Sequence, residues 1–294
     1  MKRIFLFLVT NLAIVLMLSV IAHLLGLDRY LSARGGDLGG LLVVAALFGF
    51  GGSLISLFIS KWMAKRTMGV EIIETPRSDD ERWLVEAVGA HARRTGIGMP
   101  EVGIFESPQP NAFATGASRN NALVAVSTGL LRTMRRNEVD AVLGHEIAHV
   151  ANGDMVTLTL IQGVVNTFVI FFSRIIGSAV DKALNGDREG RGGMGYFIGT
   201  MLAEMVLGIL ASIVVMWFSR QREFRADVGG AHLAGRENMI AALERLKVGA
   251  EEPLPDGLKA FGIGGGGSSG LGRLFMSHPP LDERIAALRA AGQG

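Results

Sequence analysis

Residues 145–149 read His145-Glu146-Ile147-Ala148-His149, inside a segment, 137–151, whose apolar spacing predicts a helix. Residues four apart on a helix differ in direction by about 40°, so both imidazoles leave one face one turn apart and can bind one metal ion. Glu146 then lies beside the ion and is not a ligand. We expect Asn137 to cap this helix. The segment therefore predicts a helix that carries a metal site.

A catalytic zinc site needs three protein ligands and one open position. The chain has no cysteine, so every ligand must be a histidine or a carboxylate. Glu223 is the leading candidate for the third ligand, because it stands on a predicted helix in Glu223-Phe224-Arg225-Ala226-Asp227. Asp227 shares its face and can accept the N–H of a ligating imidazole. His232 and Asp154 are the alternatives to Glu223.

The composition indicates a membrane protein with a soluble part. The chain has 294 residues, a mean hydropathy of +0.37 and 19% charged residues, and its apolar residues are gathered in long blocks. The net charge of +2 is too small to indicate a nucleic-acid partner, because the basic residues flank apolar blocks. We therefore expect a lipid bilayer, and no nucleic acid, among its partners.

Two apolar stretches at 4–25 and 38–59 are each long enough for a transmembrane helix. The first is longer than the apolar region of a secretory signal, so we interpret it as an uncleaved signal anchor. Basic residues lie beyond the outer ends of the pair, at Lys2, Arg3, Lys61, Lys65 and Arg66. By the positive-inside rule, both outer ends are cytoplasmic.

Two further apolar stretches at 155–173 and 196–218 contain Gln162, Asn166 and Glu204, which are unusual in lipid. They are either a hairpin through the bilayer or helices partly buried against the soluble domain. In both cases the number of crossings is even. The histidine pair and Glu223 can therefore lie on the same side of the membrane, which sharing an ion requires.

These segments divide the chain into four parts. Residues 1–59 form two transmembrane helices, 60–154 the first part of a soluble domain, 155–218 two further apolar helices, and 219–294 the second part of the soluble domain. The fold is expected to be mainly α with a small β-sheet. The predicted elements are strands at 101–105, 112–115 and 122–127, helices at 78–94, 220–234, 236–248 and 282–291, and a glycine-rich linker at 262–270.

Several motifs resemble those of one known family. They are 145–149 followed by Ala151-Asn152-Gly153-Asp154, the stretch 220–227, Asn111-Ala112-Phe113-Ala114-Thr115-Gly116, and Ser277-His278-Pro279-Pro280-Leu281 with Arg284. Together they resemble the HtpX-type bacterial inner-membrane zinc metalloproteases, which are related to the CAAX prenyl protease. The resemblance covers essentially the whole chain.

This resemblance implies a zincin-like gluzincin domain with one Zn²⁺ per chain, a cytoplasmic active site and cytoplasmic termini. It also implies a role in membrane-protein quality control and the stress response, with unfolded or damaged membrane proteins as substrates. Glu223 would be the third zinc ligand, and His278 would approach the reacting carbonyl.

The reaction would be peptide hydrolysis, in which Glu146 takes a proton from water and returns it to the leaving amine. Proteases usually bind substrate as an added strand. The stretch 111–115, with Asn111, Ala112 and Phe113 as the substrate-binding residues, could offer that strand edge, and so could 122–126.

Two other functions compete with this one. Arg174 and Glu204 could belong to an ion path in a zinc transporter or membrane sensor, but a transporter would hold its ligands at mid-membrane on broken helices. An inactive adaptor could retain the zinc fold, but the intact Glu146 argues against it. We expect His23 and His91 to have no role in metal binding.

Overall fold

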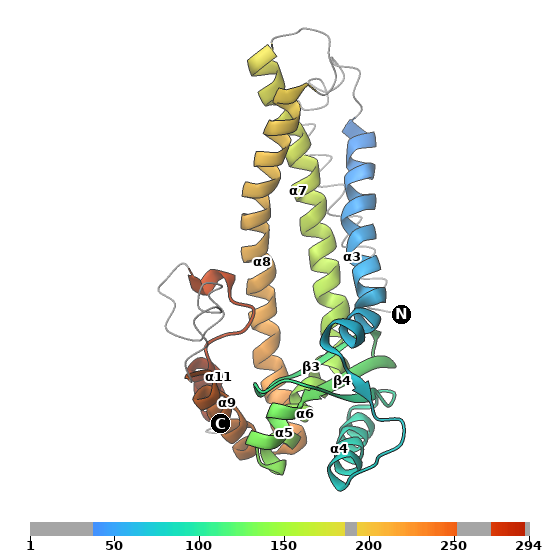
Figure 1. Cartoon of the computed structure of the whole chain (residues 1–294). Helices are drawn as coiled ribbons and strands as arrows, with labels where there is room; N and C mark the ends of the chain where they lie inside the picture. The colour runs from blue at the N-terminus through green and yellow to red at the C-terminus, as the bar shows by residue number, and fades with distance from the viewer. Residues whose placement is uncertain (1–37, 186–192, 252–271, 292–294) are drawn as a thin grey trace. The chain divides into compact units, whose positions relative to one another are not determined.

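The computed structural model of the chain describes residues 38–185, 193–251 and 272–291 (Figure 1). The helix expected at 4–25 and the linker expected at 262–270 lie outside the described residues. The chain forms two compact units. Of the described residues, 38–56, 158–185 and 193–215 are called the apolar-helix unit, and 57–157, 216–251 and 272–291 the sheet unit.

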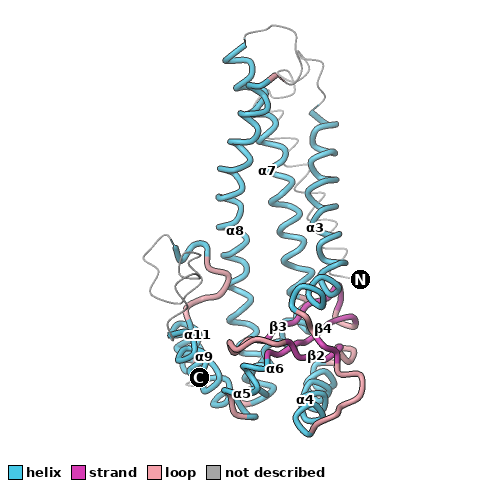
Figure 2. Tube along the Cα trace, viewed as in Figure 1, coloured by secondary structure: helices cyan, strands magenta, loops and turns pink. Residues whose placement is uncertain are grey.

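Helices dominate the described residues, as Figure 2 shows, and the only sheet among them is small. The expected fold class, mainly α with a small β-sheet, is therefore confirmed. In chain order the elements are α3 (Leu38–Met68), β1 (Glu71–Ile72), α4 (Asp79–Thr95), β2 (Glu101–Phe105), β3 (Ala112–Ser118), β4 (Asn121–Ser127), α5 (Thr128–Thr133), α6 (Arg136–Asn152), α7 (Asp154–Asn185), α8 (Met194–Ala234), α9 (Arg236–Glu251), the 3₁₀ helix η1 (Gly272–Phe275) and α11 (Leu281–Ala290).

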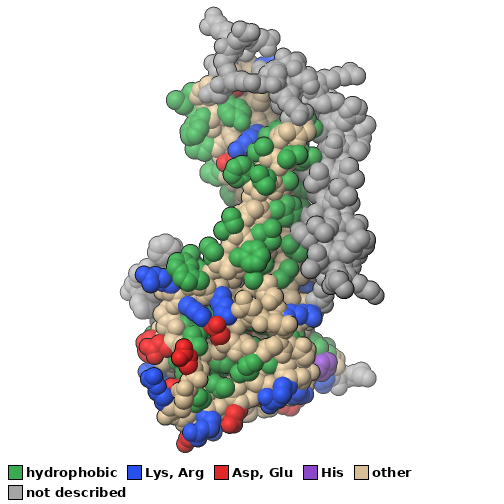
Figure 3. Space-filling model, turned by 90° about the vertical axis from the view of Figure 1, so that its right-hand side faces the viewer, with side chains coloured by type: hydrophobic (Ala, Val, Ile, Leu, Met, Phe, Trp, Pro, Cys, Tyr) green, Lys and Arg blue, Asp and Glu red, His purple; other side chains and the backbone are tan. Residues whose placement is uncertain are grey.

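The apolar-helix unit is built from parts of α3, α7 and α8, the three described helices that are long and apolar enough to cross a membrane. Many of their large hydrophobic side chains are exposed, and Figure 3 shows hydrophobic side chains distributed along one face of the molecule. Helices α7 and α8 run antiparallel, because Ser173 contacts Glu204 and, further along α7, Asp181 accepts the backbone N–H of Tyr196. They therefore form a helical hairpin.

Small residues let α3 and α7 approach closely. A Cβ atom added to Gly49 would lie 2.5 Å from Thr167 Oγ1, whereas one added to Gly52 would meet nothing within 4 Å. Ala45 and Ser53, one turn to either side of Gly49, are buried. One row of small residues on α3 is thus used for helix packing, as is common in lipid.

The sheet has four strands in the order β1-β2-β4-β3. Strands β2 and β4 are parallel, and the other two pairs are antiparallel. The stretch 122–126 belongs to β4, which lies between β2 and β3, so it cannot offer an open strand edge. Of the two strands considered for substrate binding, only β3 is at the edge of the sheet.

Helix α6 is held by the core of the sheet unit. Its Leu143 and Ile147 are fully buried in one cluster with Val124 and Val126 of β4 and Leu243 of α9. Burying an aliphatic side chain of this size contributes about 1.5–3 kcal/mol. These contacts fix the rotation of α6 about its axis and thereby the direction of its histidines.

The start of α6 differs from the sequence-based expectation. The helix begins at Arg136, and the carboxylate of Glu138 accepts the backbone N–H of Arg135 at 2.8 Å. Asn137 instead donates to Asn238 Oδ1 of α9 at 2.9 Å. The prediction that Asn137 caps the helix is wrong, because Glu138 satisfies the helix start and Asn137 has a partner on another helix.

Helix α8 is also longer than predicted. The sequence suggested an apolar helix at 196–218 and a second helix at 220–234, but the structure has one continuous helix over both. No proline separates the two stretches, so nothing in the backbone forces a break. Glu223 is therefore carried by the same helix as the last apolar stretch.

Candidate metal centre

Helix α6 presents His145 and His149 on one face, where both side chains are buried. Their Nε2 atoms lie 3.1 Å apart, and the two rings are nearly perpendicular. This is the arrangement expected from the four-residue spacing. The left-handed Gly153, with φ of 68°, ends the helix four residues after His149 and lets α7 begin at Asp154.

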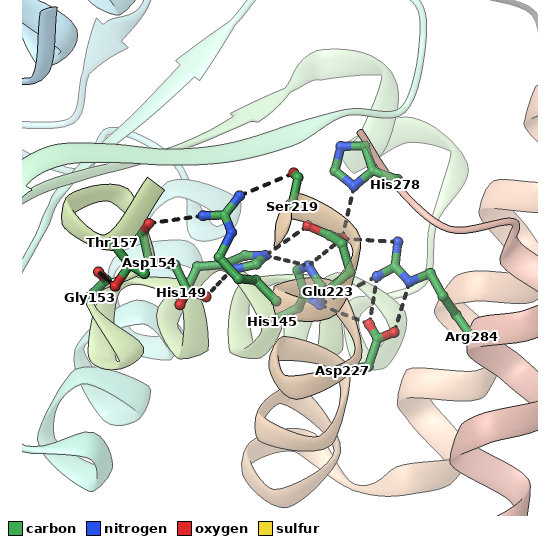
Figure 4. Close-up of polar contacts among 11 residues, drawn as sticks. His145, His149, Gly153, Asp154, Thr157, Ser219, Glu223, Asp227, His278 and Arg284 are labelled. Carbon is green, nitrogen blue, oxygen red and sulfur yellow. Dashed lines mark hydrogen bonds and ion pairs between the residues drawn. The ribbon is translucent and has the colours of Figure 1, made fainter. Parts of the chain in front are cut away.

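Glu223 of helix α8 lies beside the Nε2 atoms of the two histidines. Its Oε1 lies 3.3 Å from His149 Nε2, and its Oε2 lies 3.6 Å from His145 Nε2. The three side chains each offer one ligand atom, and these atoms all lie within 4.8 Å of one another. Figure 4 shows the three side chains converging from α6 and α8.

A carboxylate holds the outer nitrogen of each imidazole. His149 Nδ1 donates to Asp154 Oδ2 at 2.7 Å, and His145 Nδ1 lies 2.9 Å from Asp227 Oδ1. With a proton on each Nδ1, a neutral imidazole has only a lone pair on Nε2. Both Nε2 atoms are then acceptors that face the acceptor oxygens of Glu223, and a proton or a metal ion between them removes this mismatch.

The distances also fit zinc. Two ligand atoms at about 2.0–2.1 Å from one tetrahedral Zn²⁺ lie about 3.3 Å apart, and the two Nε2 atoms are 3.1 Å apart. Glu223 lies within 3.3 Å of His149 Nε2 through Oε1 and within 3.6 Å of His145 Nε2 through Oε2. Glu223 is 2% exposed, and its Oε2 accepts no hydrogen bond of ordinary geometry among the described residues. Two histidines and a glutamate with a fourth position open are a known catalytic zinc set.

The electrostatics of the cluster also favour a cation. Burial by itself lowers the pKa of His149, but the bonds to Asp154 and Glu223 and the charge of Glu146 outweigh it and raise that pKa to about 9. The pKa of His145 is raised in the same way, with Asp227 as its main partner. The negative potential that retains a proton here also attracts a divalent cation.

Arg284 of α11 is a site residue whose contact the sequence did not reveal. Its Nε and one terminal nitrogen both donate to the Asp227 carboxylate, at 2.8 and 2.5 Å, and all of these groups are buried. Its other terminal nitrogen lies 3.4 Å from Glu223 Oε2. The two-pronged ion pair fixes the carboxylate that holds His145. Arg284 stood beside the Ser277–Leu281 motif, but sequence alone could not show its partner.

A side chain of helix α8 bonds the backbone of Asp154. Arg222 of α8 donates to the backbone carbonyl of Asp154 at 3.0 Å and to Ser219 Oγ at 3.2 Å. The sequence suggested Asp154 as an alternative ligand. In the structure its carboxylate bonds the far nitrogen of His149, so it holds a histidine in place and does not face the space between the ligand atoms.

The remaining residues predicted for the site lie on α6, before α11, and at or directly before the start of β3. Glu146 is partly exposed on α6, and its charge acts on both histidines. His278, 63% exposed, places its Nδ1 2.8 Å from Glu223 Oε2. Asn111 directly precedes β3, and Ala112 and Phe113 begin that strand.

The other described histidines are apart from this cluster. His91 of α4 bonds Asp140 of α6 at 2.8 Å, and His232 lies near the end of α8, where Arg94 donates to its backbone carbonyl. Neither belongs to the described group of residues that could hold a metal. His23 lies outside the described residues.

Comparisons with known proteins agree with this geometry. The model of Peptidase family M48 matches residues 78–291. The chain is 67% identical over 290 residues to "Protease HtpX homolog" of Thiobacillus denitrificans, and 64% identical over 293 residues to "Protease HtpX" of Thioalkalivibrio sulfidiphilus, with 99% of each chain covered in both cases. Among solved structures it resembles S. mikatae Ste24p, with a TM-score of 0.55 and 19% identity, over 96% of this chain and 66% of that chain. The last likeness concerns the fold.

Proposed function

Because this chain belongs to peptidase family M48 and is a membrane metalloprotease, we propose that it is a zinc-dependent endopeptidase that cleaves misfolded or damaged membrane proteins on the cytoplasmic side of the bacterial inner membrane. The observation that carries the proposal is the buried cluster of His145, His149 and Glu223, whose ligand atoms lie within 4.8 Å of one another. Glu146 directly follows His145 on the same helix. The family membership agrees with the resemblance inferred from the sequence motifs.

Zinc, held by His145, His149 and Glu223, would polarise the scissile carbonyl and lower the pKa of water from about 15.7 toward about 7. The side chain of Glu146 accepts the proton of the attacking water as the new C–O bond forms. It then delivers this proton to the leaving nitrogen as the C–N bond breaks. Asp154 and Asp227 keep the two imidazoles in one tautomer and orientation throughout.

His278 is placed to assist the reacting carbonyl. Its ring reaches the Glu223 carboxylate from a segment that belongs to neither α6 nor α8, and most of the ring is open to an incoming substrate. Negative charge grows on the carbonyl oxygen in the transition state, so an imidazole N–H directed there bonds it more strongly than in the ground state. His278 would thus accelerate turnover without holding the metal.

The free edge of β3 is the proposed substrate platform. Ser127 N–H donates to the Asn111 carbonyl and Asn111 N–H donates to Ser127 Oγ, so the backbone groups of Asn111 are already used. By the alternation of an antiparallel ladder, the backbone groups of Ala112 and Ala114 point away from β4. They can pair with an extended peptide, while Asn111 offers an exposed side chain.

The membrane location rests on α3, α7 and α8. Only 17% of the most apolar window of α7 and 11% of that of α8 is buried, so these helices present their apolar side chains outward. A surface of this kind is stable in lipid and not in water. With cytoplasmic residues 60–66 after α3 and a hairpin of α7 and α8, the site and the carboxyl terminus would also be cytoplasmic.

The decisive experiment compares Glu146→Gln with wild type on an unfolded membrane protein in detergent. We expect the variant to retain one zinc per chain but to lose proteolysis, because Glu146 acts on water and holds no metal. Glu106→Gln, at an exposed site on the same unit, is the matched control and should remain fully active. Proteolysis by purified Glu146→Gln would refute the proposed mechanism, and loss of its zinc would make Glu146 a ligand.

A further inference from the structure

His278 lies in the segment that joins η1 to α11. Among the described residues, the segment begins at η1, continues through Met276 and reaches α11 after Pro280. The His278 ring is 63% exposed, so burial does not hold it. An imidazole that must meet a developing charge within a few tenths of an ångström needs its backbone fixed from elsewhere.

Arg220 supplies such an attachment. One terminal nitrogen of its guanidinium donates to three backbone carbonyls, those of Arg273 at 3.2 Å, Leu274 at 3.1 Å and Met276 at 2.8 Å. This nitrogen has two hydrogens, so at least one hydrogen is shared between two carbonyls. The carbonyls lie at the end of the 3₁₀ helix η1, where a cation is favourable, and that of Arg273 also accepts the backbone N–H of Met276 at 3.4 Å.

Arg220 is also on the helix that carries Glu223, three residues away. The same rigid element therefore holds a proposed zinc ligand directly and, through Arg220, the backbone two residues before His278. We propose that Arg220 is a positioning residue that sets His278 against the reacting carbonyl. This inference rests on the proposed function of His278.

The second attachment of the segment is weaker. Arg273 pairs with Glu283 of α11, but both side chains are about half exposed. Exposed ion pairs typically contribute less than about 1 kcal/mol. Of these two polar attachments, the partly buried bonds from Arg220 are therefore the stronger one.

The test is a double-mutant cycle on the full-length protein. We expect Arg220→Gln to lower kcat by about 10²-fold, as a misplaced group does, with zinc content unchanged and KM within about twofold. Because Arg220 acts through His278, adding Arg220→Gln to His278→Ala should cause little further loss. Losses that multiply in the double variant, or unchanged kcat in Arg220→Gln, would overturn the proposal.

Two further variants separate positioning from general folding. Arg220→Lys can still donate to the carbonyls and should recover most of the kcat lost in Arg220→Gln. Arg289→Gln removes an exposed arginine that pairs with Glu244 and should leave kcat unchanged. If Arg220→Lys is as slow as Arg220→Gln while Arg289→Gln is normal, the carbonyl bonds are not the cause.

Amide hydrogen exchange gives a readout that needs no activity. In the Glu146→Gln background, Arg220→Gln should speed exchange at residues 273–278, and Arg289→Gln should not. Unchanged exchange there would refute the positioning role. Faster exchange in a protein whose wild type cleaves no peptide would instead refute the proposed function and leave the structural role of Arg220 intact.

Discussion

The two units differ in where they place ionisable and large apolar side chains. The sheet unit buries a connected set of ionisable groups, namely His145, His149, Asp154, Glu223, Asp227 and Arg284. The apolar-helix unit leaves large apolar side chains exposed, including Leu47, Phe48, Ile55, Phe197, Met201, Met205 and Leu210. Exposed apolar surface is explained by lipid, whereas buried charge is costly in any solvent unless it is paired or binds an ion.

This difference in the placement of ionisable side chains indicates that the sheet unit carries the functional site. The apolar-helix unit is accounted for by its solvent and by close helix packing at Gly49. The sheet unit would be easier to fold with an apolar cluster in place of its buried charges, because paired buried charges often add no stability over apolar residues. The buried ionisable groups of the sheet unit are therefore best explained by the binding of a metal ion. Four predictions test this contrast.

The largest effect is expected from removing a metal ligand. His149→Ala and Glu223→Ala should each lose nearly all bound zinc, because a set of two protein ligands is left. Zinc per chain, measured after purification in the same detergent, checks this. Equal zinc content in wild type and Glu223→Ala would show that Glu223 is not the third ligand.

The second prediction compares a core position with an exposed one. Ile147→Ala should lower the free energy of unfolding by about 2–5 kcal/mol, because it opens a cavity in the core that holds α6. Met201→Ala, at a 51% exposed position of α8, should change it by less than about 0.5 kcal/mol. Denaturant titration in detergent measures both. Equal losses would remove the contrast between the units.

The third prediction concerns the carboxylates behind the histidines. Asp154→Asn and Asp227→Asn should each weaken zinc binding by about 10- to 100-fold, because each leaves an imidazole poorly oriented. Competition with a chelator gives the affinity. Asp140→Asn, which affects only the distant His91 pair, is the matched control and should bind zinc normally.

The smallest effect is expected in the apolar-helix unit. Gly49→Ala should destabilise the α3–α7 contact by about 1 kcal/mol, because its Cβ would overlap Thr167. Gly52→Ala, where the space is open, should be neutral or slightly stabilising. Zinc affinity should be unchanged in both. A changed affinity in Gly49→Ala would show that the metal site depends on this packing.

Much of the local structure followed from the sequence, because local signals decide it. Ser78 accepts the backbone N–H of Glu81 as expected of a helix cap, and helix α9 and strand β2 lie where their patterns predicted. The short elements α5 and β1 were missed, since two to six residues carry too little periodicity to be recognised. The cap at Asn137 failed because a partner on α9 competes for its side chain.

The apolar stretches, the helix with two histidines on one face, and the shared face of Glu223 and Asp227 could all be predicted from the sequence, because spacing of three or four residues fixes which side chains share a helix face. Four further features could be seen only in the folded chain: Asp154 bonds His149, Arg284 bonds Asp227, Arg220 bonds the segment before His278, and β3 is at the edge of the sheet. These contacts join residues that packing brings together from different elements. No local pattern encodes them, because they depend on how whole helices and strands pack.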